Sequence, residues 1–237
     1  MFSDFLSPEK WEEALAIVKS EFLMGTWETL YVTVVSTLFS VIIGLPLGVL
    51  LTVGDKKGIM PLPKVLYRAL DVIINILRSI PFLILMIMAL PLAKAIVGTK
   101  IGSTASIVPL VIAAFPFIAR LVESSLREVN PNVIEAALSM GASPLQIVVK
   151  VMLPESVPSL ISNLTIAVTT ILGYSAMSGM IGGGGLGMIA TNYGYYRYKY
   201  VVMYLAVILL VLLVQLLQSV GTALAVKCDK RLKNNRS

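Results

Sequence analysis

Long stretches without a charged side chain are the feature that most constrains how this chain can fold. Five such stretches occur, at residues 29–54, 79–93, 101–119, 156–196 and 200–226. A helix rises about 1.5 Å per residue, so roughly 20 apolar residues cross the hydrocarbon core of a membrane. Because lipid offers backbone groups no hydrogen-bond partner, each stretch must satisfy its own backbone as a helix. The stretches therefore predict membrane-spanning helices.

The composition agrees with a protein that is embedded in a bilayer. The chain has 237 residues, of which 57% are hydrophobic and 14% are charged, whereas soluble domains are about 45–50% apolar and about 25% charged. We expect an all-α integral membrane protein with five transmembrane helices and a transmembrane domain at residues 25–226. The expected spans cover about residues 29–53, 71–93, 101–120, 157–178 and 200–226.

Residue types that are missing or rare exclude several kinds of site. The chain has no histidine and one cysteine, Cys228. Histidine-based catalytic triads, most zinc sites and an internal disulfide are therefore excluded, and we predict neither a catalytic residue nor a metal ligand. Cys228 stands among lysines beside the last span, where acylation and an inert thiol both remain open. The acidic first 28 residues do not fit a cleavable signal peptide.

Lysine and arginine gather on one side of the expected spans. After the first, third and fifth spans come Lys56, Lys57, Lys64, Arg68, Arg120, Arg127, Lys150, Lys227, Lys230, Arg231, Lys233 and Arg236. The positive-inside rule then places the N-terminus outside and the C-terminus in the cytoplasm. Residues 120–155 and a basic tail at residues 227–237 are expected on the cytoplasmic side.

The N-terminal segment, residues 1–24, has the pattern of an amphipathic helix. Ser7 and Pro8 form a favourable helix start, and Trp11, Leu15, Val18 and Phe22 recur at helical spacing. Two interpretations stay open: an interfacial helix on the outer membrane face, or a helix that packs on the protein's own periphery.

Two spans contain residues that call for a specific explanation. Gly44 and Gly48 have the spacing of small residues at a close helix contact, although Pro46 between them would also kink the helix. Arg78 lies inside the second span, where it could snorkel or pair with Asp71. A residue of the translocation pathway and a structural anchor remain alternatives for Arg78.

The fourth span is unusually polar for a helix that faces lipid. Its hydroxyl and amide side chains favour a position beside the pathway, although ordinary hydrogen bonding between helices remains an alternative. Together with the second span it supplies the pathway candidates Arg78, Asn163, Thr169, Tyr174 and Met177. After it, the glycine run at residues 182–187 suits a re-entrant or hinge turn rather than a phosphate loop, since no Gly-Lys-Ser/Thr follows.

Residues 130–154, between the third and fourth spans, have the signature of two short helices. Asn130-Pro131 and Ser143-Pro144 are both N-cap and first-turn proline pairs, and Gly141 suits the left-handed end of the first helix. Pro154 and Pro158 are expected to end the second helix.

Apolar side chains in this polar, expected cytoplasmic segment require a partner groove. They are Val133, Ile134, Ala137, Leu138, Leu145, Ile147 and Val148. A DNA-binding helix-turn-helix is excluded, because the segment is tethered to spans at both ends and Lys150 is its one cation. A protein on the cytoplasmic side is the expected partner.

Within this segment, Glu135-Ala136-Ala137, Gly141 and Val151 with Leu153-Pro154 resemble the EAA loop of ABC importer permeases. Further matching segments lie at residues 27–29, 78–82, 114–120, 173–177 and 185–187. Over about residues 25–225, the chain resembles the permease subunit of methionine-type ABC importers, within the ABC transmembrane type-1 family. Val151 stands where isoleucine is commoner in that loop.

The resemblance implies a type I ABC importer fold and a multi-pass permease of the bacterial cytoplasmic (inner) membrane. It implies a homodimer, two copies of a cytoplasmic ATPase and an extracytoplasmic binding protein that delivers methionine, with the L form expected and the D form a further expectation. The residues that it assigns to ATPase coupling are Glu135, Ala136, Ala137, Gly141, Leu153 and Pro154. The chain has no Walker motif, so it is expected to be no enzyme and to hold no cofactor, with ATP and magnesium bound by the partner.

Other functions remain as alternatives. The nearest is a permease for another amino acid of the same family. An ATP-independent secondary carrier is less well supported, because such carriers tend to hold ionisable residues near the bilayer midplane and the last three uncharged stretches hold none. An intramembrane enzyme lacks a recognisable catalytic arrangement, and no feature favours nucleic acid.

Overall fold

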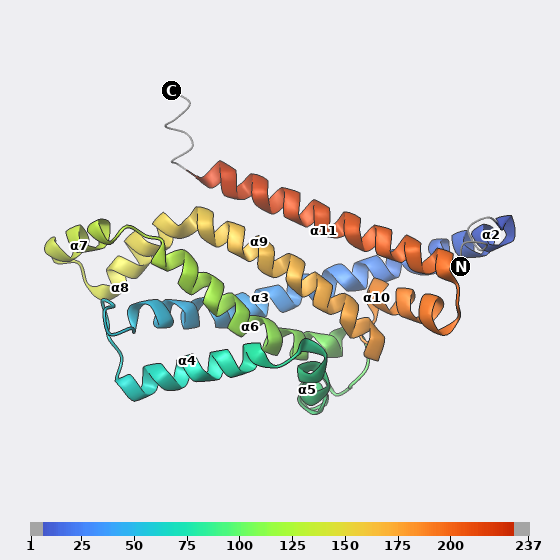
Figure 1. Ribbon diagram of the computed structural model, residues 1–237, viewed down its shortest axis with the longest axis horizontal. Helices are drawn as coiled ribbons and strands as arrows, with labels where there is room; N and C mark the ends of the chain where they lie inside the picture. Colours follow the sequence, from blue (N-terminus) through green and yellow to red (C-terminus); the bar gives the residue numbers. More distant parts are fainter. Residues whose placement is uncertain (1–6, 230–237) are drawn as a thin grey trace, which may run out of the picture. The chain divides into compact units, whose positions relative to one another are not determined.

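The structure is a computed structural model that describes residues 7–229, and helices joined by short turns make up this part of the chain (Figure 1). The first six residues and positions 230–237 of the expected basic tail lie outside the described residues. The elements in chain order are α2 (Pro8–Ile17), the π-helical η1 (Val18–Phe22), α3 (Leu23–Val53), α4 (Lys64–Ser79), α5 (Phe82–Val97), α6 (Ser103–Arg127), α7 (Pro131–Ser139), α8 (Pro144–Ile147), the π-helical η2 (Val148–Met152), α9 (Leu153–Ser178), the 3-10 turn η3 (Gly179–Ile181), α10 (Gly185–Ile189), the π-helical η4 (Ala190–Tyr196) and α11 (Tyr200–Cys228).

The helices form two compact units. Within the described residues, unit 1 comprises residues 7–38, Pro81–Ala113 and Val168–Leu217. Unit 2 comprises Phe39–Ile80, Ala114–Ala167 and residues 218–229. Four helices, α3, α6, α9 and α11, contribute a segment to each unit.

The expected fold class is confirmed, because the apolar stretches form helices long enough to cross a membrane. In the described part of the chain, four continuous helical segments meet that length and hydropathy, and α4 with α5 supplies a fifth if the pair counts as one broken span. The four segments are Pro8–Val53, Ser103–Arg127, Pro144–Ile181 and Tyr200–Cys228.

The expected second span, residues 71–93, is not one continuous helix. Helix α4 ends at Ser79, Ile80 has extended backbone angles (φ −77°, ψ 127°), and α5 starts after Pro81. The ring of a proline disfavours helical angles at the residue before it, so Pro81 breaks the helix at Ile80. The apolar stretch is thus divided into an amphipathic helix and an apolar one.

The expectation that Pro154 and Pro158 end the second helix of the cytoplasmic segment is wrong. Helix α8 continues through η2 into α9, and Pro158 lies inside α9. A proline within a helix removes one hydrogen bond and clashes with the preceding turn. The π-helical turn η2 ends at Met152, two positions before Pro154, and widens the helix where that clash would occur.

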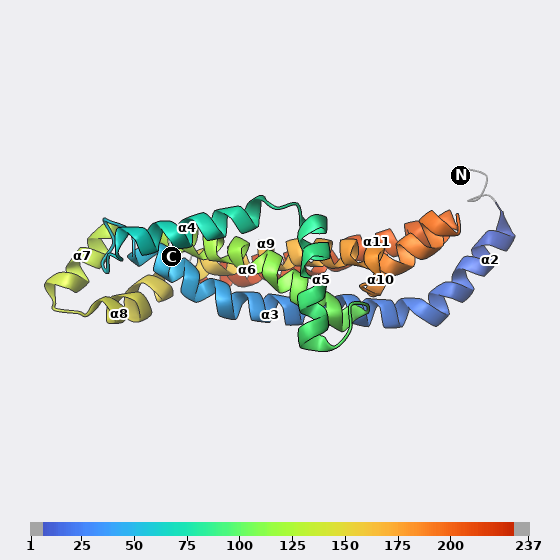
Figure 2. The ribbon, with the colours of Figure 1, turned by 90° about the horizontal axis from the view of Figure 1, so that it is seen from below.

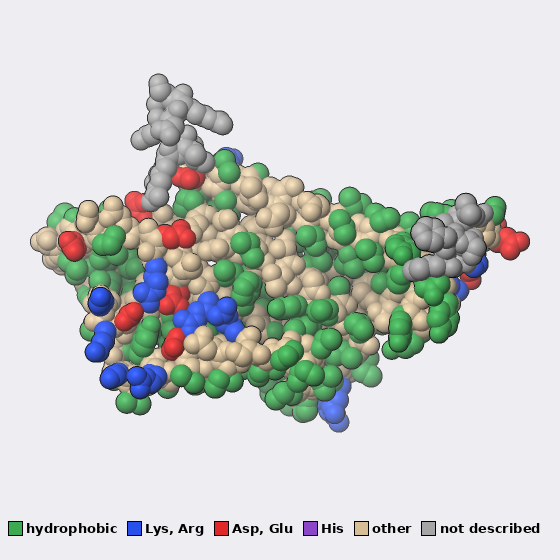
Figure 3. Space-filling view, viewed as in Figure 1, with side chains coloured by type: hydrophobic (Ala, Val, Ile, Leu, Met, Phe, Trp, Pro, Cys, Tyr) green, Lys and Arg blue, Asp and Glu red, His purple; other side chains and the backbone are tan. Residues whose placement is uncertain are grey.

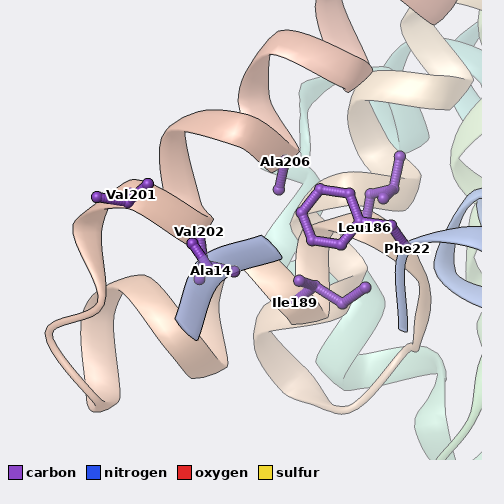
Figure 4. Packing of buried hydrophobic residues seen from close by; sticks show 7 residues of the cluster. All are labelled: Ala14, Phe22, Leu186, Ile189, Val201, Val202 and Ala206. Carbon is purple, nitrogen blue, oxygen red and sulfur yellow. The ribbon is translucent and has the colours of Figure 1, made fainter. Parts of the chain in front are cut away.

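The core of unit 1 joins the N-terminal helix to α10 and α11. Phe22 from η1 lies beside Leu186 of α10 and Ala206 of α11, in a cluster that also contains Ala14 (Figure 4). Leu15 on α2 is 49% exposed. The N-terminal segment therefore packs on the protein with part of its apolar face, and both of its earlier interpretations keep some support.

In unit 2, α3 and α6 lie beside each other (Figure 2), and they approach closely at two glycines of α3. An added methyl group at Gly48 would lie 2.5 Å from the carbonyl oxygen of Ala119, and one at Gly44 would lie 2.9 Å from that of Phe115. These separations are below van der Waals contact. The prediction of close helix packing at the glycine pair is confirmed within the chain itself.

Candidate functional site

The expected coupling segment folds as a pair of short helices in unit 2. Asn130 occupies the N-cap of α7, where its side-chain oxygen accepts a hydrogen bond from the N–H of Asn132 at 3.0 Å, and Pro131 fills the first helical position. Such a cap satisfies a backbone donor that the helix itself cannot. The first predicted helix start is therefore confirmed.

The turn between α7 and α8 has the predicted geometry as well. Gly141 has a φ of +78°, and its N–H donates to the carbonyl of Leu138 at 2.9 Å. Ser143 and Gln146 then form a capping box, in which the backbone N–H of Ser143 donates to the side chain of Gln146 at 2.9 Å. Figures 1 and 2 both show α7 and α8 beside each other. We call residues 130–154 the coupling element.

One face of the coupling element is packed and the other is open. Ala137 and Ile147 are buried, whereas Leu138, Met140 and Leu145 are 45%, 81% and 72% exposed. Apolar side chains at such exposure on a polar segment favour contact with a partner protein.

The six expected coupling residues occupy different parts of this element. Ala137 packs inward and Leu153 is half-buried at the start of α9. The other residues are exposed: Glu135, Ala136, Gly141 and Pro154. The structure therefore leaves four of the six accessible to a partner, and the coupling role itself stays a prediction.

A group of paired charges, which the sequence reasoning missed, lies in unit 2 before the coupling element. We call Asp55, Asp71, Arg120, Glu123 and Arg127 the charged network. Glu123, only 8% exposed, accepts from Arg120 Nη1 at 2.7 Å and from Arg127 Nε at 3.0 Å. On one helix, Glu123 lies three positions after Arg120 and four positions before Arg127. This spacing in the sequence favours ion pairs and could have indicated them.

The same network corrects the expected partner of Arg78. Asp71 pairs with Arg120, which also donates to Asn75 Oδ1 at 3.0 Å, while Arg78 is exposed at the end of α4. Figure 3 shows acidic and basic side chains intermixed on the face of unit 2 that carries α4. Moving a charge out of water costs less free energy when the charge is paired than when it is alone. Asp71 therefore pairs with the half-buried Arg120 and not with the exposed Arg78.

The five pathway candidates are divided between the units. In unit 2, Asn163 donates to Ser125 Oγ at 2.8 Å and to the carbonyl of Leu121 at 3.3 Å, whereas Arg78 is exposed elsewhere on α4. This contact of α9 with α6 agrees with the alternative of ordinary hydrogen bonding between helices. The pathway role of Asn163 therefore gains no support from its geometry.

In unit 1, three pathway candidates lie on the second half of α9. The ring of Tyr174 stacks on Phe82 with centroids 4.3 Å apart and an interplanar angle of 5°. Thr169 is half-buried and Met177 is 44% exposed. Tyr174 thus holds the first turn of α5 against α9, and the roles of all three in transport stay predictions.

The glycine run forms a turn in unit 1 that side chains of α3 cap. Gly184 and Gly185 have φ angles of +76° and +75°. The N–H of Gly185 donates to Glu28 Oε2 at 2.6 Å, and that of Leu186 donates to Thr29 Oγ1 at 2.9 Å. A re-entrant or hinge-like turn agrees with this geometry, since only glycine adopts these angles without strain.

Several tyrosines follow the turn, and most of them are exposed. Tyr195, Tyr196 and Tyr198 are 72%, 62% and 70% exposed. Tyr193 instead donates a hydrogen bond to Glu21, and this bond, together with burial, raises the pKa of the Tyr193 hydroxyl above its ordinary value. The exposed rings suit a membrane interface.

Two proteins of bacterial transport systems resemble this chain over most of its length. It is 50% identical over 210 residues to a protein of Vibrio cholerae serotype O1 named "Probable D-methionine transport system permease protein MetI", with 88% of this chain and 92% of the relative covered. It is 52% identical over 155 residues to the D-methionine transport system permease protein MetI of Escherichia coli K12, with 65% and 71% covered.

Solved structures agree with these relatives. A structure of inward-facing conformations of the MetNI methionine ABC transporter matches with a TM-score of 0.88 and 47% identity, covering 90% of this chain and 98% of the other. An amino acid ABC transporter matches with a TM-score of 0.69 at 21% identity, which supports the fold alone. The sequence profile of one family matches residues 44–233. The chain therefore belongs to the family of binding-protein-dependent transport system inner membrane components.

Proposed function

We propose that this chain is the permease subunit of an ATP-driven methionine importer. Two copies form the translocation pathway, two copies of a separate ATPase bind the coupling elements, and an extracytoplasmic binding protein delivers the substrate. The coupling element and the C-terminus face the cytoplasm, and the N-terminus faces the other side. ATP and magnesium bind to the ATPase, and this chain acts as a transport subunit rather than an enzyme.

The observation that carries this proposal is the exposed apolar face of the coupling element. Leu138, Met140 and Leu145 stand on a two-helix element whose starts and turn are fixed by local hydrogen bonds. A rigid element that presents such a face suits a groove in another protein. In the proposed cycle, closure of the ATPase dimer displaces the coupling elements and thereby opens the spans to the outside.

Methionine as the substrate rests on the two MetI relatives, named for D-methionine, and on the MetNI structure. The decisive measurement is uptake of labelled L-methionine by cells that lack other methionine systems and carry the complete transporter. Unlabelled L- and D-amino acids are then added as competitors. L-methionine, and D-methionine as well, should compete most strongly. Failure of both to compete, with another amino acid competing instead, would overturn the substrate and leave the ATP-driven permease in place.

Docking of the ATPase is tested by two changes in the coupling element. Glu135→Lys reverses an exposed charge, and Gly141→Pro removes the left-handed turn. Each should reduce co-purification of the ATPase and methionine uptake together. Glu9→Lys makes the same charge reversal at an exposed position of α2 and should leave both measurements unchanged. Full uptake with either coupling variant, and an ATPase that still co-purifies, would contradict the proposed site.

A further inference from the structure

Glu123 is the centre of the charged network in unit 2. Its Oε2 accepts from Arg120 Nη1 at 2.7 Å, and its Oε1 accepts from Arg127 Nε and Nη2 at 3.0 and 2.9 Å. Arg120 reaches Asp71 on α4, and Arg127 reaches Asp55 in the turn after α3 at 3.3 Å. One nearly buried carboxylate thus orients two guanidinium groups that point to two other elements.

Helix α4 is attached within unit 2 by a small apolar cluster and by this network. Ile74 is its only buried side chain, and it packs with Leu51 and Ala119, while the partly buried Tyr67 and Leu70 pack against the same cluster. Most of the other large apolar side chains of α4 are exposed, at 45% to 83%: Val65, Leu66, Val72, Ile73 and Ile76. Polar contacts from Asp71 and Asn75 to Arg120 therefore add a second attachment of α4 to α6 within the unit.

The network also lies next to the coupling element along the chain. Helix α6 ends at Arg127 and α7 begins at Pro131. Between them, Val129 is 6% exposed and its N–H donates to the carbonyl of Leu126 at 3.4 Å. A short and anchored linker transmits a displacement of α7 to the end of α6 instead of absorbing it.

One donor of the network is unused. Among the described residues, Arg120 Nε is buried without a hydrogen-bond partner, while both of its Nη groups are bound. A buried donor that lacks an acceptor is costly and calls for an explanation. The Nε donor of Arg120 can therefore take a further acceptor that comes within hydrogen-bond distance.

We propose that Glu123 and Arg120 are positioning residues that link α4 to the coupling element. Glu123 holds Arg120 on Asp71, so that α4 moves with α6 when the ATPase displaces α7. This inference rests on the proposed function, because it names the residues that carry that displacement to a span. Without the link, the ATPase still closes and hydrolyses ATP, but α4 does not follow.

The test is Glu123→Gln in the complete complex of permease, ATPase and binding protein, reconstituted in lipid vesicles. Arg120 binds one carboxylate oxygen of Glu123 and Arg127 binds the other, and glutamine puts a donor NH₂ group at one of these two positions, where it faces a guanidinium group without accepting from it. ATP hydrolysis should stay within about twofold of the unmodified complex, while uptake falls about fivefold or more, as the loss of a typical coupling between sites implies. The ratio of ATP hydrolysed to substrate imported then rises, which a purely structural defect would not cause.

A matched control makes the same exchange outside the network. Glu128→Gln alters an exposed carboxylate directly after α6 and should leave the ratio unchanged. Asp71→Asn removes the negative charge at the other end of the link, at a side chain that is 36% exposed, and should raise the ratio as Glu123→Gln does. Because both act through Arg120, the double variant should be no worse than the more affected single variant.

Two results would overturn the inference. One is an unchanged ratio in both variants, and the other is a parallel loss of hydrolysis and uptake. If Glu123→Gln does not assemble with the ATPase, Asp71→Asn decides by the same two results. Hydrolysis and its stimulation by the loaded binding protein can be compared whichever substrate is bound. Failure of methionine uptake in the unmodified complex would therefore count against the substrate and not against the network.

Discussion

One junction in each unit is held by a different chemistry. In unit 1, backbone N–H groups of Gly185 and Leu186 donate to Glu28 and Thr29, and the glycines supply the conformation. In unit 2, carboxylates and guanidinium groups join α6 to α4 and to the turn after α3. A turn that is held through its backbone N–H groups needs positions without a side chain. Any oxygen acceptor can bind these N–H groups. A junction held by charge depends on which side chains are present.

The largest effect is expected where unit 1 leaves no room for a side chain. A Cβ atom at Gly187 would lie 2.1 Å from the carbonyl oxygen of Ala176, which is backbone and cannot turn away. Gly187→Val should therefore cost about 3 kcal/mol or more and leave little folded protein. The fraction that stays soluble in detergent after heating measures this. Gly173→Ala, where the added methyl meets open space, is the control, and equal losses in both would refute the packing argument.

The same exchange in both units separates charge from hydrogen bonding. Glu123→Gln should lower the melting temperature by an amount that corresponds to about 2 kcal/mol, because one arginine loses its acceptor. Glu28→Gln keeps an oxygen for the N–H of Gly185 and should cost less than about 1 kcal/mol. Glu28→Ala removes the acceptor and should cost more than Glu28→Gln. Equal shifts in melting temperature for Glu123→Gln and Glu28→Gln would contradict the difference between the units.

Unit 2 also contains turns held through the backbone, and one of them is at Gly141. A Cβ there meets open space, so the φ of +78° alone opposes a side chain. Gly141→Ala should cost about 1 kcal/mol, and Gly141→Asn less, since asparagine tolerates left-handed angles better. Thermal unfolding of the two variants beside the unmodified chain checks the order. A larger loss for asparagine than for alanine would show that space and not φ limits this position.

An effect as small as that at Gly141 is expected at Tyr193 in unit 1, whose neutral hydroxyl donates to the carboxylate of Glu21. The pKa of Tyr193 is raised, mainly by its hydrogen bond to Glu21. Because the folded value exceeds the unfolded one of about 10, the bond stabilises fully below pH 10 and is lost as pH rises through the raised pKa. Tyr193→Phe should cost about 1 kcal/mol at pH 8, and the cost should shrink above pH 10. Tyr195→Phe, at an exposed ring, should show no such pH dependence.

Features set by neighbouring residues were predictable from the sequence. The two helix starts at Asn130 and Ser143 and the turn at Gly141 are local, because each cap joins residues no more than three positions apart. Four of the five spans were predictable for a similar reason, since hydropathy acts along each segment. The break at Ile80 also has a local cause, since Pro81 disfavours helical angles at the residue before it. The prediction of one continuous span relied on the length of the apolar stretch instead.

Features that depend on contacts between distant segments were not predictable in this way. Asp71 and Arg120 are 49 positions apart, and only the packing of α4 on α6 brings them together. The suggestion that Arg78 could pair with Asp71 relied on spacing within one helix. The prediction that Pro154 ends a helix was wrong for another reason: the π-helical turn before it has no simple sequence signature.

The glycine contact between α3 and α6 also determines the direction in which residues of the following turn point. Gly48 is fixed against Ala119, and seven positions later Asp55 reaches Arg127. Removing or adding one residue between Gly48 and the end of α3 would rotate everything beyond it by about 100°. Asp55 would then face away from its arginine although no residue of the ion pair had changed. Homologous permeases that keep this pair should therefore vary in side chains along this stretch of α3, and not in its length.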